Sequence, residues 1–437
     1  MPRSLLPLVF FCLAALHCGA AYQPRRCIVA ASRDADSEAA AIADAFARCA
    51  SDAEIVFPAG AEYRAYEPVV ATRLRNVVIT VDGNLSLPRD VPALQKLVEV
   101  KGGDLAWFRL GGTNVQWIGS SEPDAGWIKS YGQAWWDINR PGEGGAPNRP
   151  RLMQFNVTDG VMQNPKSMKP IGRGFSIEGS NITISDAVVD ARSDAESGGG
   201  GGFPFDTDGF GVGAADVTIT NSRIFGGGDA VAVSDGARNV LFRKATIGFH
   251  TRGMTVGPLG SGVSSSAGVQ NIRFEDVTVL GGLYAARFTS RIGGKGLARN
   301  VTWSNIRVDN VTFPIFVTQT YYNHAGTGRD GPSNSSVTME DFTWEHFSGS
   351  INTYNPGDGS CTTNPCWYNS GLVKLTHTEA VIIGCSSGSS CKGFKTRDIR
   401  IDPQSRTVPK VICMHVVPDL NPDLGFECAN GTYIISR

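Results

Sequence analysis

The stretch VTITNSRIFGGGDAVAVSDGARNVLFRKATI, residues 217–247, carries one apolar pattern twice. Two inward-facing residues alternate with polar ones, a short polar break follows, and two further inward-facing residues complete the pattern. The two copies are Val217, Ile219, Ser222, Ile224 and Val240, Phe242, Ala245, Ile247. Alternation of this kind is typical of short strands with one buried face, and the break predicts a bend that returns apolar side chains inward.

The same pattern recurs along most of the chain, with copies that begin at residues 182, 217, 240, 272, 301, 337 and 394. The closest copies are 23 residues apart, and the others differ by inserted loops. A period of about 20 to 35 residues with one supersecondary unit per repeat indicates a solenoid. Because the unit consists of strands, we predict an all-β fold, a right-handed single-stranded parallel β-helix that forms a single domain over residues 21–437.

Residues 1–20 predict a secretory signal peptide. A basic start precedes the apolar run LLPLVFFCLAAL, and small residues stand around Ala20. No later apolar run in the sequence is long enough to span a bilayer, so we expect a secreted, extracellular protein. Seven Asn-X-Ser/Thr sequons favour a glycoprotein.

The eight cysteines beyond the predicted leader indicate disulfides, because an even number in a secreted chain is typical of oxidised pairs. Sequence neighbours are the expected partners: Cys27–Cys49, Cys361–Cys366, Cys385–Cys391 and Cys413–Cys428. Zinc is the competing interpretation, but the cysteine spacings are irregular and no histidine accompanies them. We therefore expect no metal and no cofactor.

The charge balance excludes some classes of partner. The 40 basic and 41 acidic residues leave a net charge of −1, which gives no electrostatic case for binding nucleic acid or an anionic membrane.

Two aspartates at the spacing of one coil are the first candidate for a site. Successive coils of a β-helix stack at the strand spacing of about 4.8 Å, so residues one period apart lie side by side. Asp208 and Asp229 are 21 residues apart, and Arg252 follows 23 residues later. We expect Arg287 to continue this column after a longer coil. The competing interpretation for an aspartate before glycine is a solvated turn.

These segments resemble glycoside hydrolase family 28, the polygalacturonase-like pectinases, and in particular its fungal exo-acting members. AIADAFARCASDAEIVFPAGAEYRA is similar to the family's N-terminal capping helix and first strand, and GQAWWDINRPGEGGAPNRPRLMQF to the tryptophan-rich loop of the exo-acting group. IGFHTRGMTVGPLG, YAARFTSRIGGKGLARNVTWSNI and FPIFVTQTYYN are similar to its later coils. The resemblance covers nearly the whole mature chain, and it implies a short helix that caps the open end of the β-helix.

The chain departs from all four site motifs of that family, so its catalytic set is degenerate. Asn-Thr-Asp is Asp206-Thr207-Asp208 here, and Gly-Asp-Asp is Gly227-Gly228-Asp229, which puts Gly228 where the family has its general acid. Arg252-Gly253 replaces His-Gly, with His250 two residues earlier. Arg287-Phe288-Thr289 keeps the arginine of Arg-x-Lys and lacks the lysine.

The resemblance implies hydrolysis of α-1,4-galacturonosyl or related uronate linkages with inversion, and we expect exo action of altered or weak activity. It gives Asp208 and Asp229 the water-activating role, and it gives Arg287 and Tyr321 contacts to the substrate's carboxylate and ring. We add Arg252 and His250 to the expected substrate-binding residues. The implied partner is an acidic plant polysaccharide such as pectin or galacturonan, and we expect a monomer.

Three interpretations of the missing acid stay open. Asp206 could supply the proton, because like-charge neighbours raise the pKa of a carboxyl. Alternatively, Arg252 or Arg287 could act as the base of a uronate lyase, or the groove could bind polysaccharide without cleaving it. Trp127, Trp135 and Trp136 predict either a sugar-stacking wall or core packing.

Overall fold

The computed structural model describes residues 25–32, 36–139, 144–194, 202–260, 268–321, 334–361, 363–369, 372 and 374–434. The signal peptide predicted at residues 1–20 lies outside this described part. None of the helices within it has the length and apolar character to cross a membrane.

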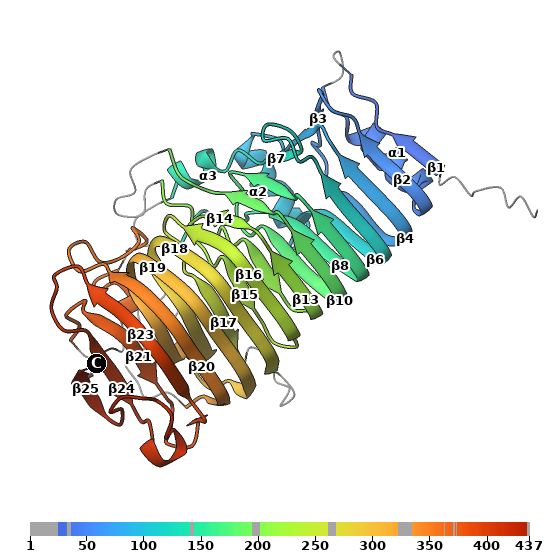
Figure 1. Cartoon of the computed structure of the whole chain (residues 1–437). Coiled ribbons are helices and arrows are strands. Elements are labelled where there is room, and N and C mark those ends of the chain that lie inside the picture. The colour runs from blue at the N-terminus through green and yellow to red at the C-terminus, as the bar shows by residue number, and fades with distance from the viewer. Residues whose placement is uncertain are drawn as a thin grey trace, which may run out of the picture.

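The chain winds into a parallel β-helix, as the repeat predicted (Figure 1). Each coil passes through three strand positions, which build three faces, here called A, B and C in the order that the chain visits them. Strands of face A alone are β1 (Arg25–Ile28), β2 (Ser51–Phe57), β13 (Ala215–Thr220) and β22 (Cys391–Lys392). Strands of face B are β3 (Glu62–Arg64), β5 (Asn84–Ser86), β7 (Trp127–Lys129), β9 (Lys166–Met168), β11 (Val188–Asp190) and β14 (Arg223–Phe225).

Strands of face C are β12 (Phe210–Val212), β15 (Val231–Val233), β17 (Met254–Leu259), β21 (Glu379–Gly384) and β24 (Lys410–Met414). Longer strands run through a bend and serve two or three faces: β4 (Val69–Val81), β6 (Ala106–Gly119), β8 (Arg151–Gln163), β10 (Phe175–Ser185), β16 (Arg238–Gly248), β18 (Gly268–Arg291), β19 (Lys295–Tyr321), β20 (Ser336–Ile351) and β23 (Lys395–Pro403). The helical elements are α1 (Ala39–Arg48), α2 (Val91–Val100), α3 (Gln133–Asp137), η1 (Trp367–Asn369) and η2 (Pro418–Leu420).

The apolar repeat becomes the register of face A. Ile182, Val217, Val240, Ile272 and Val301 pair in succession, so each first residue of the pattern stacks on the next. All five side chains are buried. Each coil thus adds one buried apolar side chain to this column, and burial of such columns is the main stabilising contribution of the sequence pattern.

One copy of the repeat was placed in the wrong phase. Val301 pairs with Phe342, so the in-register copy begins there and not at Val337, which lies opposite Gly296. The reason is that β20 has apolar residues at both phases, and the side chains of Val337 and Phe342 are both fully buried. Pattern alone could not distinguish the two.

Stacked aromatic side chains fill the interior of the later coils. The rings of Trp303 and Trp344 lie 5.7 Å apart with an interplanar angle of 2°. Phe274 stacks on Trp303 from the preceding coil at 5.4 Å. Aromatic residues at paired positions of successive coils therefore lie in contact, an arrangement that favours stacking of their rings in the core.

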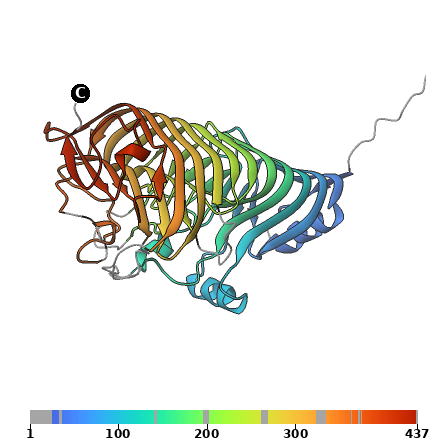
Figure 2. The ribbon, with the colours of Figure 1, turned by 90° about the horizontal axis from the view of Figure 1, so that it is seen from below.

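Further elements lie at both ends of the solenoid. Helix α1 lies at the first coils, as the resemblance implied, and its Ile42 and Phe46 are buried (Figure 2). At the other end β25 (Gly431–Ile434) pairs antiparallel with β24.

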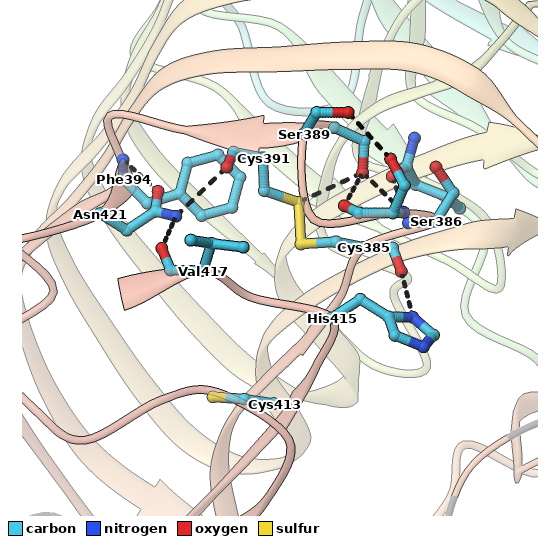
Figure 3. Close-up of a disulfide and its surroundings, with 12 residues drawn as sticks. Cys385, Ser386, Ser389, Cys391, Phe394, Cys413, His415, Val417 and Asn421 are labelled. Carbon is cyan, nitrogen blue, oxygen red and sulfur yellow. Dashed lines mark hydrogen bonds between the residues drawn. A yellow bond between two sulfur atoms is a disulfide. The ribbon is translucent and has the colours of Figure 1, made fainter. Parts of the chain in front are cut away.

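The four predicted disulfides are confirmed: Cys27–Cys49, Cys361–Cys366, Cys385–Cys391 and Cys413–Cys428. Figure 3 shows how Cys385–Cys391 is embedded in the C-terminal cap. His415 contacts the carbonyl oxygen of Cys385 through Nδ1 at 3.0 Å, and Asn421 donates to the carbonyl oxygen of Cys391 at 3.2 Å. The bridge thus ties the last coils to the segment that closes them.

Candidate active site

The candidate site lies at the corner where face B turns into face C. On face C, residues Phe175, Phe210, Val231, Met254 and Ala286 pair in succession. Two positions before them, the same register aligns Arg173, Asp208, Asp229, Arg252 and Tyr284. The column that the spacing of Asp208, Asp229 and Arg252 predicted is therefore present.

Arg287 does not continue that column, contrary to the expectation from sequence. It pairs with Thr255, and Tyr284 occupies the column position instead. The coil between Met254 and Ala286 is longer than the two coils before it, and its sequence alone does not determine which of its residues reaches the column. Its side chain still returns to the column, because Arg287 Nη1 lies 3.4 Å from Asp229 Oδ1.

Asp208 and Asp229 form one connected pair. The backbone N–H of Asp229 donates to Asp208 Oδ1 at 2.9 Å. Asp229 Oδ1 in turn accepts from the hydroxyl of Thr255 at 2.6 Å. The Nε of Arg173 lies 3.6 Å from Asp208 Oδ2.

The two carboxyls hold protons more tightly than isolated aspartates do. Burial first, and then the charge of Asp229, raise the pKa of Asp208 to about 6. Burial also raises the pKa of Asp229, against the opposing effects of Arg287 and Thr255. Because their side chains are only 17% and 14% exposed, water screens this repulsion poorly. The pair therefore carries less than two full negative charges in mildly acidic solution.

Asp206 stands in the same cleft but has different partners. Its Oδ2 lies 2.8 Å from Arg149 Nη2, and its Oδ1 lies 3.3 Å from Arg252 Nη1. Arg149 also donates to the carbonyl oxygen of Phe205. Asp206 thus links residues from three distant segments, and it is 30% exposed.

Close packing around Asp208 leaves no room for a side chain at position 228. A Cβ at this position would lie 2.3 Å from Asp208 Oδ1 and 2.7 Å from the Asp208 backbone nitrogen. The Asp208 carboxylate therefore occupies the space that a side chain at residue 228 would need. No larger residue can enter without displacing Asp208.

Aromatic rings flank the predicted substrate-binding arginines. Arg252 is buried with its guanidinium 5.1 Å from the ring centre of Trp367. The guanidinium of Arg287 lies 4.6 Å from the ring of Tyr284 and 5.8 Å from that of Tyr321. Nε of both arginines is buried without a hydrogen-bond partner among the described residues. Rings hold the planar guanidiniums in place while leaving their donors available.

A cleft of about 380 Å³ is lined by the three aspartates, two arginines and the tyrosine of the site: Asp206, Asp208, Asp229, Arg252, Arg287 and Tyr321. A polar extension of about 570 Å³ continues from it past Asp206 and is bordered by residues 145–149. The lining of the two spaces includes six arginines: Arg149, Arg151, Arg173, Arg252, Arg287 and Arg291. Such a cleft suits a ligand with several carboxylates, because guanidinium forks bind them in a bidentate fashion.

Four of those arginines were missed from sequence. Arg173 and Arg151 belong to the same column as Asp208, one and two coils earlier, and they precede the first copy of the apolar pattern at residue 182. Arg291 lies beside the Tyr321 ring, with a guanidinium–ring distance of 5.7 Å. Arg149 comes from a loop and had no repeat signal at all.

The remaining predicted residues are placed as follows. Tyr321 lines the cleft. His250 packs edge-on against Phe203 at 5.6 Å and does not belong to the cleft lining, so its binding role stays a prediction. Trp135 and Trp136 are 1% exposed and belong to the core, whereas Trp127 lies partly exposed on face B.

Comparison with known proteins gives concordant results. The family model "Glycosyl hydrolases family 28" matches residues 53–368. The chain is 48% identical to the probable exopolygalacturonase C of Aspergillus terreus (strain NIH 2624 / FGSC A1156), over 95% of this chain and 94% of that protein. The protein of the same name from Neosartorya fischeri is also 48% identical, over 99% and 97% of the two chains.

A solved structure shares the fold. The endo-xylogalacturonan hydrolase from Aspergillus tubingensis superposes with a TM-score of 0.68 at 22% identity, covering 93% of this chain and 99% of that one. At this identity the likeness shows the parallel β-helix and nothing finer.

Proposed function

The chain belongs to glycosyl hydrolases family 28, and is a glycosidase; from this premise we propose that it hydrolyses the terminal α-1,4-galacturonosyl bonds of pectic galacturonan. The observation that carries this proposal is the buried Asp208–Asp229 pair set in a cleft with six arginines. A galacturonan chain has one carboxylate on each sugar, which matches cations on both sides of the pair. The names of the fungal relatives agree with this substrate.

We assign Asp208 and Asp229 to water activation. A pair one coil apart, at about 4.8 Å, is too close to supply both the acid and the base of an inverting enzyme, whose carboxyls are about 6.5–9.5 Å apart. Asp229 keeps Thr255 and Arg287 as partners, which favour its ionised form. Because the pKa of Asp208 is raised to about 6, the pair can take up a proton in mildly acidic solution, as a general base requires.

We assign protonation of the leaving oxygen to Asp206, the carboxyl that shares Arg252 with the cleft. Arg149 and Arg252 lie beside this carboxyl as ion-pair partners. A bound uronate carboxylate competes for these guanidiniums and adds a negative charge nearby. Both changes favour protonation of Asp206 in the complex, so that substrate binding itself sets up the acid.

A wall at one end of the cleft supports action at chain ends. The segment 144–150, here called the wall segment, includes residues 145–149, which border the polar extension, and it is fastened to the site through Arg149. Asn139 braces the wall, because it donates to the carbonyl oxygen of Phe203 at 2.7 Å and accepts from Ala146 N–H at 2.9 Å. A polymer that enters from the cleft meets this wall, which favours release of terminal sugars.

Gly228 at the usual acid position favours a second candidate, a polysaccharide-binding protein without activity. A product assay on polygalacturonate distinguishes the two. New reducing ends that appear as monomer support the proposal, and absorbance from an unsaturated uronate would instead indicate a lyase. Binding without either product, after long incubation at pH 4 to 6, would overturn the hydrolase assignment.

A further inference from the structure

A second hollow lies on the outer side of face B, separate from the cleft. It encloses about 640 Å³ over β7, β9, β11, β14 and β16, which pair in succession along the solenoid; Figure 1 labels β7, β14 and β16 of this series. Its lining includes Trp127, Lys166, Val188, Arg223 and Phe225, and we call it the face B groove. The β-helix does not require a hollow on face B, because the strands would pair in the same way if their outward side chains were small.

The groove carries an excess of positive charge. Its lining holds four cations, Lys166, Arg192, Arg223 and Lys244, against two carboxylates, Asp186 and Asp190. Arg192 is satisfied by Asp190 at 2.5 Å. Lys166, Arg223 and Lys244 make no ion pair within the described part of the chain. The lining thus has two positive charges in excess, and the exposed side chains of Arg223 and Lys244 are available to an anion.

Lys166 is the strongest sign of a missing partner. It is 5% exposed, and its ammonium donates to the carbonyl oxygens of Glu122 and Ala125 without touching a carboxylate of the described residues. Burial lowers the pKa of Lys166, with Glu122 and Asp124 nearby acting in the opposite direction. A cation that is buried and paired only with carbonyls costs free energy, which an anionic ligand would offset.

Aromatic surface accompanies these cations. The ammonium of Lys166 lies 5.8 Å from the ring centre of Trp127. At the other end Phe225 packs edge-to-face on Phe249 at 5.0 Å, and Arg192 covers both rings at 5.3 and 5.6 Å. Flat apolar rings beside cations suit a ligand that has both apolar ring faces and carboxylates, as an acidic sugar does.

We propose that the face B groove is a second binding site for acidic polysaccharide, distinct from the cleft. Its ligand class rests on the proposed function, whereas the groove and its charge do not. Strand β14 leads directly through Gly226–Asp229 to the carboxyl pair, so the groove and the cleft lie on successive sides of the same coils. Polymer bound in the groove keeps chain ends close to the cleft and raises their effective concentration.

The test uses Asp229→Asn protein, so that the polymer is not consumed, and measures retention on insoluble polygalacturonate. The double variant Arg223→Glu/Lys244→Glu should weaken retention about tenfold and reduce its dependence on salt. The matched control is Arg238→Glu/Lys295→Glu, which changes the net charge equally at exposed positions outside the groove. The control should retain the polymer as the parent does.

A second arm separates the groove from the cleft. With Asp229 intact, the double variant should cleave trigalacturonate at the parental rate, while its rate on insoluble polymer falls. Adding Arg287→Ala to the binding variant should remove the residual retention. Equal losses in the double variant and the control, or retention unaffected by the double variant, would overturn the proposal. If trigalacturonate is not cleaved at all, the proposed function fails while the binding result still stands.

Discussion

The Asp208 carboxylate accepts a hydrogen bond from the backbone N–H of Asp229 at 2.9 Å, which joins two acids that are 21 residues apart in sequence. Their burial makes the pair unfavourable in its doubly charged form. Stability and activity both depend on how this pair titrates.

The contribution of Asp208 to the stability should fall as the pH rises from about 4 to 6. The pKa of Asp208 is raised from 3.8 to about 6, so in this window the folded protein binds more protons than the unfolded chain. Stability is therefore lost with rising pH, by up to about 3 kcal/mol, and levels off above the folded pKa. Asp208→Asn should remove most of this slope in urea unfolding at pH 4 and pH 7. Asp419→Asn, at an exposed position, should keep it; an unchanged slope in Asp208→Asn would contradict the assignment.

The leaving group should decide whether Asp206 is the acid. Asp206→Asn should lower kcat on galacturonan about 10²- to 10⁴-fold, because the leaving oxygen departs unprotonated. On an aryl galacturonide, whose leaving group needs no proton, the same variant should lose little. Asp229→Asn is the comparison and should lose activity on both substrates. Equal losses of Asp206→Asn on both substrates, or a product that retains the anomeric configuration, would point to another acid.

Gly228→Ala should damage the site that its side chain would enter. The new Cβ overlaps Asp208 Oδ1, so the carboxylate must turn away and its bond from Asp229 N–H is lost. We expect a loss of roughly 10² in kcat, the scale of a misplaced catalytic group. Gly211→Ala is the control for stability, since its Cβ meets no atom within 4 Å. Full activity in Gly228→Ala would show that the Asp208 position is not required.

Arg149→Ala should loosen the wall segment and change the products. It removes the bonds to Asp206 and to the Phe205 carbonyl oxygen that hold residues 144–150 against the site. We expect a higher KM and longer oligosaccharides among the first products, with a faster loss of viscosity per bond cleaved. Arg149→Lys keeps the charge without the fork and should be intermediate. If Arg149→Ala still released only monomer, the wall segment would not be the cause of action at chain ends.

The tryptophan stack gives a test of the core. Trp344→Ala should lower the free energy of unfolding by about 3–5 kcal/mol, because it opens a cavity beneath Trp303. Trp344→Phe should cost less than about 1.5 kcal/mol, since it keeps an aromatic ring and removes a buried indole N–H that has no partner among the described residues. Similar losses in both variants would mean that stacking of the ring contributes little.

The sequence could predict what repeats and not what is inserted. Face A follows from apolar alternation, and Asp208, Asp229 and Arg252 follow from coil spacing, because stacking converts a period into a contact. Arg287 was misplaced where a coil lengthens. Arg149 was missed because a loop residue obeys no period. Trp127 and Trp135 look alike in sequence, yet one faces solvent and the other the core, a choice that only the packed loop makes.

The overlap between Asp208 and any side chain at residue 228 also bears on how such a site can change over generations. An aspartate at 228 cannot be accommodated while the Asp208 carboxylate keeps its present orientation, and turning it away breaks the bond to Asp229. Single substitutions in either direction therefore pass through a damaged intermediate. The two positions are epistatic: a lineage that has taken glycine here is held to the Asp208 orientation that glycine permits, and can leave it only by changing neighbouring residues together.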